Sequence, residues 1–587
     1  MIGILPQGAF GPSRAPLHRL VVRLGLSCFL FLMIAQRKQD TSVWLALTNP
    51  VFSGLWVASV ISGTCVSAHD TAATWLMNSL GASPFYLSLM ATSASLPFFL
   101  FTLPAGSISD LTNRRNLFLG SYLWLAGGAG LLAICTWLRL INPGLILATV
   151  FLLGIGFAFN APVWAAIIPE IVRRRQLASA VTLGGVQMNL AGIVGPALGG
   201  FLLPLLGPAA LFSINALAFL LAAFIISRRY RDRRRPRPHL ENFLESFATA
   251  ARYVRYAPGM QVILVRDGLF AVFIAAIPAL VPVVALHHLR LQPAQLGVVF
   301  TSLGLGSLLG ATVVLPYARA RVTPNMLTIL ADLILVTVFV LMAGVRNIAL
   351  FPIVAILAGI SWTVTASELW VAGQRAMPDW ARGRMNAVHM MVSQGGIALG
   401  GVLWGWAATA YGVETALLGG AILLVGSLVL IMPLSINFAQ NLELDPAPLR
   451  ELHDFPNVPN PEDGPVTVTM EFTIRLEDRE EFLSLMTKVR LMFLRNGASL
   501  FRVDETLEEP GKFRTEMLVN SWAEHLRQHA RITREENELF SKAMAMNANG
   551  DSPPIRHYLP ANRTSTPIAF GEFRKRGLAS QRAFEEN

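Results

Sequence analysis

A succession of long apolar runs constrains this chain more than any other feature. Twelve runs follow one another between residues 51 and 435, each about 20 residues or longer, which is the length an α-helix needs to cross a bilayer. We predict helices at about 51–78, 84–109, 116–138, 144–169, 178–204, 208–227, 260–286, 294–316, 325–344, 348–373, 385–410 and 414–435. The first part of the chain is therefore predicted to be an all-α polytopic membrane protein.

Composition supports this class. The chain is 53% hydrophobic and only 14% charged, whereas soluble domains carry about 25% charged residues. Residues 1–440 contain 28 Lys and Arg against 12 Asp and Glu, while residues 441–587 contain 19 against 24. The basic excess therefore belongs to loops beside the membrane, and no nucleic-acid partner is needed to explain it.

Most basic residues fall in alternate connections between the predicted helices, and the opposite set holds only Arg139, Arg290 and Arg346. This pattern indicates that the basic connections share one side of the membrane. By the positive-inside rule that side is the cytoplasm, so both termini are expected there. Two sets of six helices around a long basic segment are typical of two six-helix halves. The cytoplasmic connections contain Arg114, Arg115, Arg173, Arg174, Arg175, the 228–258 segment, Arg319, Arg321, Arg375, Arg382 and Arg384.

These patterns divide the chain into segments. Within the basic segment, an amphipathic helix at about 239–256 is expected to lie on the inner membrane surface. We expect an N-terminal extension 1–43, a six-helix half 44–227, a basic cytoplasmic linker 228–258, a second six-helix half 259–437, a linker 438–464, a cytoplasmic domain 465–560 and a disordered tail 561–587.

The segment after residue 464 changes to a soluble pattern. Strands are predicted at about 466–474, 499–507, 512–520 and 555–559, with helices at about 478–495 and 522–546. This βαββαβ order predicts a ferredoxin-like α+β domain. His525 and His529 stand four apart on a predicted helix, a spacing that can bind zinc, and only His557 offers a third ligand. We expect no metal and no cofactor here.

The stretch Pro104-Ala-Gly-Ser-Ile-Ser-Asp110-Leu-Thr-Asn-Arg114-Arg115 resembles the signature loop between helices 2 and 3 of the major facilitator superfamily. Leu111, Thr112 and Asn113 replace the usual Arg and Gly. A second stretch, Asn189 to Gly200, resembles the antiporter motif of drug exporters through Gly195, Pro196, Gly199 and Gly200.

Two further stretches narrow the resemblance. Gln374 to Arg384, which runs into Gln394-Gly-Gly and Leu399 to Gly405, is similar to the helix 10–11 region of the enterobactin-exporter-like branch. Ser521-Trp-Ala-Glu-His-Leu-Arg-Gln-His529-Ala-Arg531-Ile-Thr533 is similar to the tail of that branch, which is described as transmembrane secretion effectors. The resemblance covers about residues 44–560.

The resemblance implies a transporter of the bacterial plasma membrane and no enzyme activity. It would export a siderophore- or drug-like small molecule by alternating access, in exchange for protons, around a cavity lined by helices 1, 4, 7 and 10. Asp110 would close the cytoplasmic face near the start of helix 11, where a helix N-terminus attracts a carboxylate. The expected gate residues are Gly106, Asp110, Arg114, Arg115, Glu170, Arg382 and Arg384. The alternative is a set of exposed ion pairs, each contributing about 0–1 kcal/mol.

Four carboxylates fall within predicted helices, where an ionisable group is functional by default. We select Asp70 and Glu368 as candidates for proton coupling, since the resemblance places both on cavity-lining helices; binding a cationic substrate is the alternative role. Asp267 is expected to pair with its neighbour Arg266, and Asp332 to reach toward the membrane surface.

Other functions remain as alternatives. The soluble domain could be an oxidative or regulatory module that the helices tether, or the chain could be a receptor that transports nothing. Self-association through the soluble domain is a further expectation. No P-loop motif is present, so ATP-driven transport by this chain is not expected.

Overall fold

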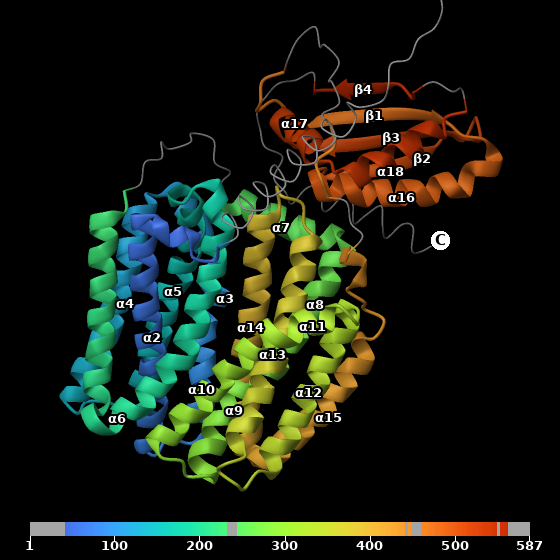
Figure 1. Ribbon diagram of the computed structural model, residues 1–587. Coiled ribbons are helices and arrows are strands. Elements are labelled where there is room, and N and C mark those ends of the chain that lie inside the picture. The colour runs from blue at the N-terminus through green and yellow to red at the C-terminus, as the bar shows by residue number, and fades with distance from the viewer. Residues whose placement is uncertain (1–41, 232–242, 441–443, 449–458, 549–551, 561–587) are drawn as a thin grey trace, which may run out of the picture. The chain divides into compact units, whose positions relative to one another are not determined.

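The computed structural model describes residues 42–231, 243–440, 444–448, 459–548 and 552–560. Most of the expected N-terminal extension, the middle of the basic linker, part of the 438–464 linker and the whole tail 561–587 lie outside these residues. The described chain forms two compact units. The first is a bundle of long helices and the second contains a four-stranded sheet (Figure 1).

Eleven helical stretches among the described residues are long and apolar enough to cross a membrane. The longest, 174–229, contains one residue with non-helical backbone angles, Gly207 at φ 76° and ψ 166°. A positive φ suits glycine because it has no Cβ. The break divides this stretch into two helices on either side of Gly207, so twelve crossings result, as the sequence predicts.

The first half of the bundle contains helices α2 to α6. Two of them, α2 and α5, begin at a Pro that follows an Asn, and the side chains of Asn49 and Asn142 accept backbone N–H groups of the first turn. Their bounds are α2 Pro50–Ser79, α3 Pro84–Leu111, α4 Arg114–Trp137, α5 Pro143–Ile171 and α6 Leu177–Arg229.

The second half follows the linker helix α7, Phe243–Tyr256, which is where the amphipathic helix is expected. Two of its long helices contain a π-helical turn, at Val284–His288 and Gly310–Val314, and such turns arise mostly as local bulges in α-helices. The bounds are α8 Pro258–Ile274, α9 Ala276–Val283, α10 Pro293–Leu309, α11 Leu315–Arg319, α12 Pro324–Gly344, α13 Phe351–Arg375, α14 Arg382–Tyr411 and α15 Val413–Ile431.

The C-terminal α+β domain has the connectivity β-α-β-β-α-α-β. Its antiparallel sheet has the strand order β2-β3-β1-β4, and alternate residues of β1, Val468 and Phe472 among them, pack on Phe482 and Val489 of α16. The elements are β1 Val466–Thr473, α16 Arg479–Asn496, β2 Leu500–Glu505, β3 Lys512–Val519, α17 Trp522–Arg531, α18 Arg534–Ala545 and β4 Ile555–Tyr558.

The helix predicted at about 522–546 is two helices instead of one. Ile532 is extended, and Thr533 begins α18 with a capping box in which Glu536 also takes part. A Thr with a Glu three residues later is a helix-start signal that the sequence carries. A single helix was predicted because apolar residues continue at helical spacing across the break.

The second compact unit extends beyond the α+β domain. It also contains residues 245–261, which include most of α7, and the connection 375–383 between α13 and α14. The Tyr253 hydroxyl donates to the Ala376 carbonyl at 3.2 Å, and the Arg531 guanidinium lies 4.8 Å from the Trp380 ring centre. The expected 228–258 linker and 259–437 half therefore each contribute residues to this unit.

Candidate transport site and gate

We name the two ends of the bundle by their connections. The motif end carries the α3–α4 connection at residues 112–113, and the far end carries the α2–α3 connection at residues 80–83. Because successive helices cross in opposite directions, the α13–α14 connection lies at the motif end and the α14–α15 connection at the far end.

At the motif end, the signature arginines fasten α4 to its neighbours in the first half. Arg114 pairs with Glu170 at the end of α5, with 2.5 Å between Nη1 and Oε1. The other carboxylate oxygen of Glu170 accepts the Tyr230 hydroxyl at 3.1 Å, and Arg115 donates to the carbonyls of Tyr230 and Ser227. These contacts all join helices of the first half.

The other expected gate residues are near this end. Asp110 belongs to the last turn of α3, and its side chain lies outside the described part of the structure. Gly106 stands one turn earlier, and a Cβ there would meet no atom within 4 Å. Arg382 pairs with Asp379 at 2.7 Å, and Arg384 is half-buried in the first turn of α14.

The glycines of the α6 motif bring three helices into backbone contact. A Cβ on Gly195 would lie 2.7 Å from the Thr64 carbonyl oxygen of α2, and one on Gly199 would lie 2.8 Å from the Ala68 carbonyl oxygen. Gly200 faces Gly297 of α10, whose own Cβ would lie 2.6 Å from the Pro196 carbonyl oxygen. Their role in the structure is close packing.

A matching contact joins the halves between α3 and α14. A Cβ on Gly405 would lie 2.7 Å from the Ser88 Cβ, and one on Gly401 would lie 3.1 Å from the Thr92 backbone nitrogen. The Thr92 hydroxyl also donates to the Ala398 carbonyl at 2.8 Å. We call these two contacts, α3 with α14 and α6 with α10, the seam. It runs from the far end toward the middle of the bundle.

The two carboxylates selected from the sequence have different surroundings. Asp70, on α2, is exposed, and its neighbour His69 is fully buried with its ring 4.6 Å from that of Phe212. Glu368, on α13, is buried and pairs with Arg319 at the end of α11, with 2.6 Å between Nε and Oε1. Arg319 was not expected as its partner.

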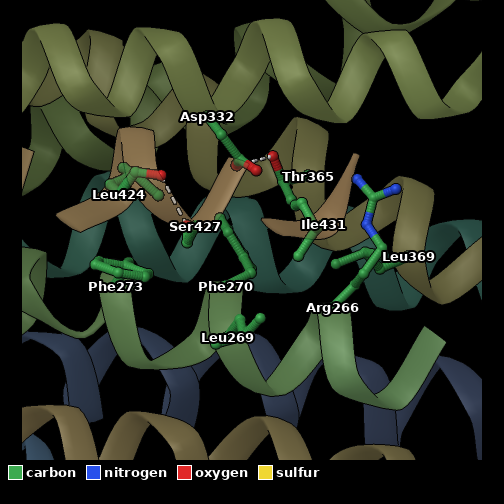
Figure 2. A pocket seen from close by; sticks show the side chains of 10 residues that line it. All are labelled: Arg266, Leu269, Phe270, Phe273, Asp332, Thr365, Leu369, Leu424, Ser427 and Ile431. Atoms are coloured by element: carbon green, nitrogen blue, oxygen red, sulfur yellow. Dashed lines mark hydrogen bonds between the residues drawn. The ribbon is translucent and has the colours of Figure 1, made fainter. Parts of the chain in front are cut away.

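A small pocket adjoins Asp332 in the second half (Figure 2). Asp332 accepts the Thr365 hydroxyl at 2.9 Å and is buried, so the expected reach to the membrane surface is wrong. The cavity volume is about 10 Å³, which is room for about one water molecule and too little for a siderophore or drug.

The expected pair of Asp267 with Arg266 is also wrong, because the two side chains leave α8 in different directions. Arg266 donates to the Thr328 hydroxyl at 2.6 Å, to the Asn325 side chain and to the Leu434 carbonyl. Asp267 instead faces His389 of α14, with 3.6 Å between Oδ2 and Nε2. The only sequence signal for His389 is a lone histidine in an apolar run.

Three histidines gather in the C-terminal domain, two from α17 and one from β4. The Nε2 atom of His525 lies 3.3 Å from that of His529 and 3.2 Å from that of His557. Burial, together with these two neighbours, lowers the pKa of the His525 imidazole from 6.5 to about 3. Among the described residues, no group of three or more His, Cys, Asp or Glu could hold a metal ion.

Curated relatives of this chain are named as exporters. The enterobactin exporter EntS of Salmonella paratyphi A is 26% identical over 406 residues, which is 66% of this chain and 93% of that protein. Macrolide efflux protein A of Streptococcus pyogenes is 21% identical over 261 residues, 44% of this chain. The chain spans 64% of the length of the latter.

Solved structures show the same fold. The nucleoside transporter NupG has a TM-score of 0.52 at 12% identity, covering 65% of this chain and 98% of that one. A bacterial homologue of the human lysosomal transporter Spinster has a TM-score of 0.52 at 14% identity, covering 66% and 96%. Residues 41–565 match the family described as transmembrane secretion effector. Because that match takes in both the helices and the α+β domain, the chain belongs to this family, whose membrane part has the fold of the major facilitator superfamily.

Proposed function

We propose that this protein exports a siderophore- or drug-like small molecule by alternating access, in exchange for protons. The observation that carries the proposal is the seam, in which helices of the two six-helix halves meet in matched pairs, α3 with α14 and α6 with α10. Its relatives named as exporters of enterobactin and of macrolides support the cargo class.

The seam supports alternating access because its two contacts are equivalent. The second and eighth crossings, α3 and α10, hold the same place in their halves, and so do the fifth and eleventh, α6 and α14. Each contact therefore pairs the second helix of one half with the fifth helix of the other. Repeats related by a two-fold axis along the membrane normal require this pairing. Rocking of the halves separates both contacts together and opens a central space at the far end.

The basic connections at the motif end support a bacterial inner-membrane protein with that end and both termini in the cytoplasm. Within this arrangement we assign Asp110, with Arg384, to closing the motif end, while Gly106 leaves room for the approaching helix. Arg114, Arg115 and Glu170 brace the same end within the first half, and Arg382 contributes to the α13–α14 connection.

Asp70 and Glu368 remain the sequence-selected candidates for contact with protons or cargo. Asp70 is accessible on the first crossing, as a cargo-facing group must be. Glu368 already has a cationic partner in Arg319, so taking up a proton would require that pair to open. This difference favours Asp70 for contact with a cationic cargo.

The function is tested by expressing the full chain in a bacterial strain that lacks its own efflux pumps. We expect lower accumulation of a macrolide or a catecholate siderophore, restored to the level of the empty strain by a protonophore. Asp110→Asn should abolish export while the protein still inserts in the membrane. Accumulation equal to that of the empty strain for both cargo classes would contradict export of this cargo class.

A further inference from the structure

We propose that Asp267 of α8 and His389 of α14 form the site that binds the coupling proton. The inference deepens the proposed function and rests on it, since it assigns one step of proton-driven export to named groups. Neither Asp70 nor Glu368 is part of this site, which lies between the seventh and eleventh crossings.

Two buried titratable side chains face each other here without a hydrogen bond between them. The side chains are 3% and 6% exposed, and 3.6 Å separates Asp267 Oδ2 from His389 Nε2. That is too long for a hydrogen bond. In the described part of the chain, Asp267 Oδ2 and His389 Nδ1 have no hydrogen-bond partner. A buried carboxylate in this state is costly to keep ionised, and a proton shared with the imidazole relieves that cost.

Other charged groups nearby are directed elsewhere. Arg266 points to α12 and to the chain after α15, Glu368 is held by Arg319, and Asp332 is bonded to Thr365. Arg384 lies more than one helical turn before His389 on α14. The rings of Trp370 and His389 are perpendicular, with ring centres 5.2 Å apart. The contacts of the first three of these charged groups therefore do not involve the carboxylate of Asp267 or the imidazole of His389.

The position of the pair links the proton to the seam. A Cβ on Gly396 of α14 would lie 3.0 Å from the Gly268 carbonyl oxygen of α8, and one on Gly400 would lie 2.5 Å from that of Val272. These contacts fix α14 directly on α8 beside the pair. Because α14 is also the seam helix that packs on α3, a change in how Asp267 attracts His389 acts on a helix that must move when the halves separate.

The proton step balances without any other reactant. A proton enters from the side with the higher proton concentration and forms an O–H bond on the Asp267 carboxylate, with the imidazole of His389 accepting a hydrogen bond from it. After the halves rock, that O–H bond breaks and the proton leaves to the cytoplasm. One cargo molecule moves outward in the same cycle.

The test uses the full-length protein in lipid vesicles that contain a pH-sensitive dye. Two quantities are measured with a macrolide as cargo, namely counterflow of labelled cargo against unlabelled cargo and proton movement driven by a cargo gradient. Asp267→Asn should keep counterflow and lose proton movement to the level of protein-free vesicles, whereas Asp267→Glu should restore it. Asp332→Asn is the matched control, because it neutralises a buried carboxylate in the same half, and should leave both quantities unchanged.

The outcomes separate the inference from the function. Counterflow without proton movement in the wild type would overturn the inference and leave export standing, and absence of counterflow in the wild type would overturn both. Unchanged proton movement in Asp267→Asn overturns the inference alone. If Asp267→Asn loses counterflow as well, the same two quantities are measured in His389→Gln. Loss of proton movement in that variant with counterflow kept supports the site. Unchanged proton movement in that variant overturns it.

Discussion

At the scale of single residues, burial determines which of the many ion pairs contribute substantially to stability. Glu524 of α17 shows this directly, because it pairs with two arginines on the same helix. Arg531 lies 2.7 Å away and is 7% exposed, whereas Arg527 lies 2.8 Å away and is 47% exposed. The distances are nearly equal, but solvent screens the exposed Arg527 pair far more than the buried Arg531 pair.

We expect Arg531→Met to destabilise the C-terminal domain by about 3–5 kcal/mol, because it leaves a buried carboxylate without its main partner and an Asn496 carbonyl without its donor. Arg527→Met, the matched control, should cost about 0–1 kcal/mol. The measurement is the urea concentration at which a brief protease pulse begins to degrade the domain in the full-length protein. Equal losses in the two variants would contradict this account.

The pairing partners of single side chains were the features predicted least well from the sequence. Asp267 and Arg266 are adjacent, and a local pair was the simplest expectation. Neighbours on a helix point about 100° apart, so each side chain meets a different helix, and the identity of that helix depends on the packing of distant segments. The pair of Glu170 with Arg114 is easier to anticipate, because both residues lie at predicted helix ends on the same side of the membrane.

At the scale of elements, the glycines of α6 differ in what they face although they share one motif region. A Cβ on Gly200 would lie 2.8 Å from the Pro293 carbonyl oxygen and 2.9 Å from the Gly297 Cα of α10. A Cβ on Gly192, two turns earlier on the same helix, would meet nothing within 4 Å. The seam therefore depends on particular glycines and not on glycine content.

We expect Gly200→Ala to lower both export and the thermal unfolding midpoint of the protein in detergent, since overpacking of this kind costs about 1–3 kcal/mol. Gly192→Ala should leave both near the wild-type values. The comparison controls for the loss of backbone freedom, which is the same at both positions. A wild-type midpoint in Gly200→Ala would show that α6 and α10 can separate without cost.

The histidine cluster of α17 and β4 makes the C-terminal domain sensitive to pH. Since the folded pKa of His525 is about 3 and the unfolded value is 6.5, the unfolded chain binds a proton below pH 6.5 while the folded domain does not. Stability is therefore complete above pH 6.5 and falls as the pH drops toward 3.

Between pH 7 and pH 5 this single group should lower the free energy of unfolding by about 2 kcal/mol. The measurement is the urea midpoint of protease resistance at the two pH values, in the wild type and in His525→Gln. The variant should lose most of the pH dependence, because it lacks the buried imidazole whose pKa is lowered on folding. An identical pH dependence in the two proteins would assign it to other groups.

Elements were predicted well where length and turn residues decide them. The membrane crossings follow from apolar length. Gly207-Pro208 marks the break within α6, since a positive φ at Gly207 ends one helix and Pro208 begins the next. The split of α17 from α18 was missed, although the capping box of Thr533 and Glu536 marks it.

At the scale of the whole molecule, the sequence predicted the order of the parts and not their grouping. The 375–383 connection and most of α7 belong to the same compact unit as the α+β domain. Nothing in their composition shows this, because the grouping depends on contacts such as Tyr253 with Ala376 that join segments far apart in the chain. The seam could not be predicted either, since glycines indicate close packing but do not identify the partner helix.

The requirement that the seam opens gives the last prediction. Ser88 and Gly405 face each other across it at the far end, near enough for a disulfide after a small shift. In a background with Cys28, Cys65 and Cys135 replaced by Ser, oxidation of the Ser88→Cys, Gly405→Cys double variant should stop export, and a reducing agent should restore it. The reduced protein is its own control for any packing cost, and either single variant should not respond to oxidant. Export that continues after complete cross-linking, judged by loss of free thiols, would mean that the halves do not separate at the far end and that cargo leaves by another route.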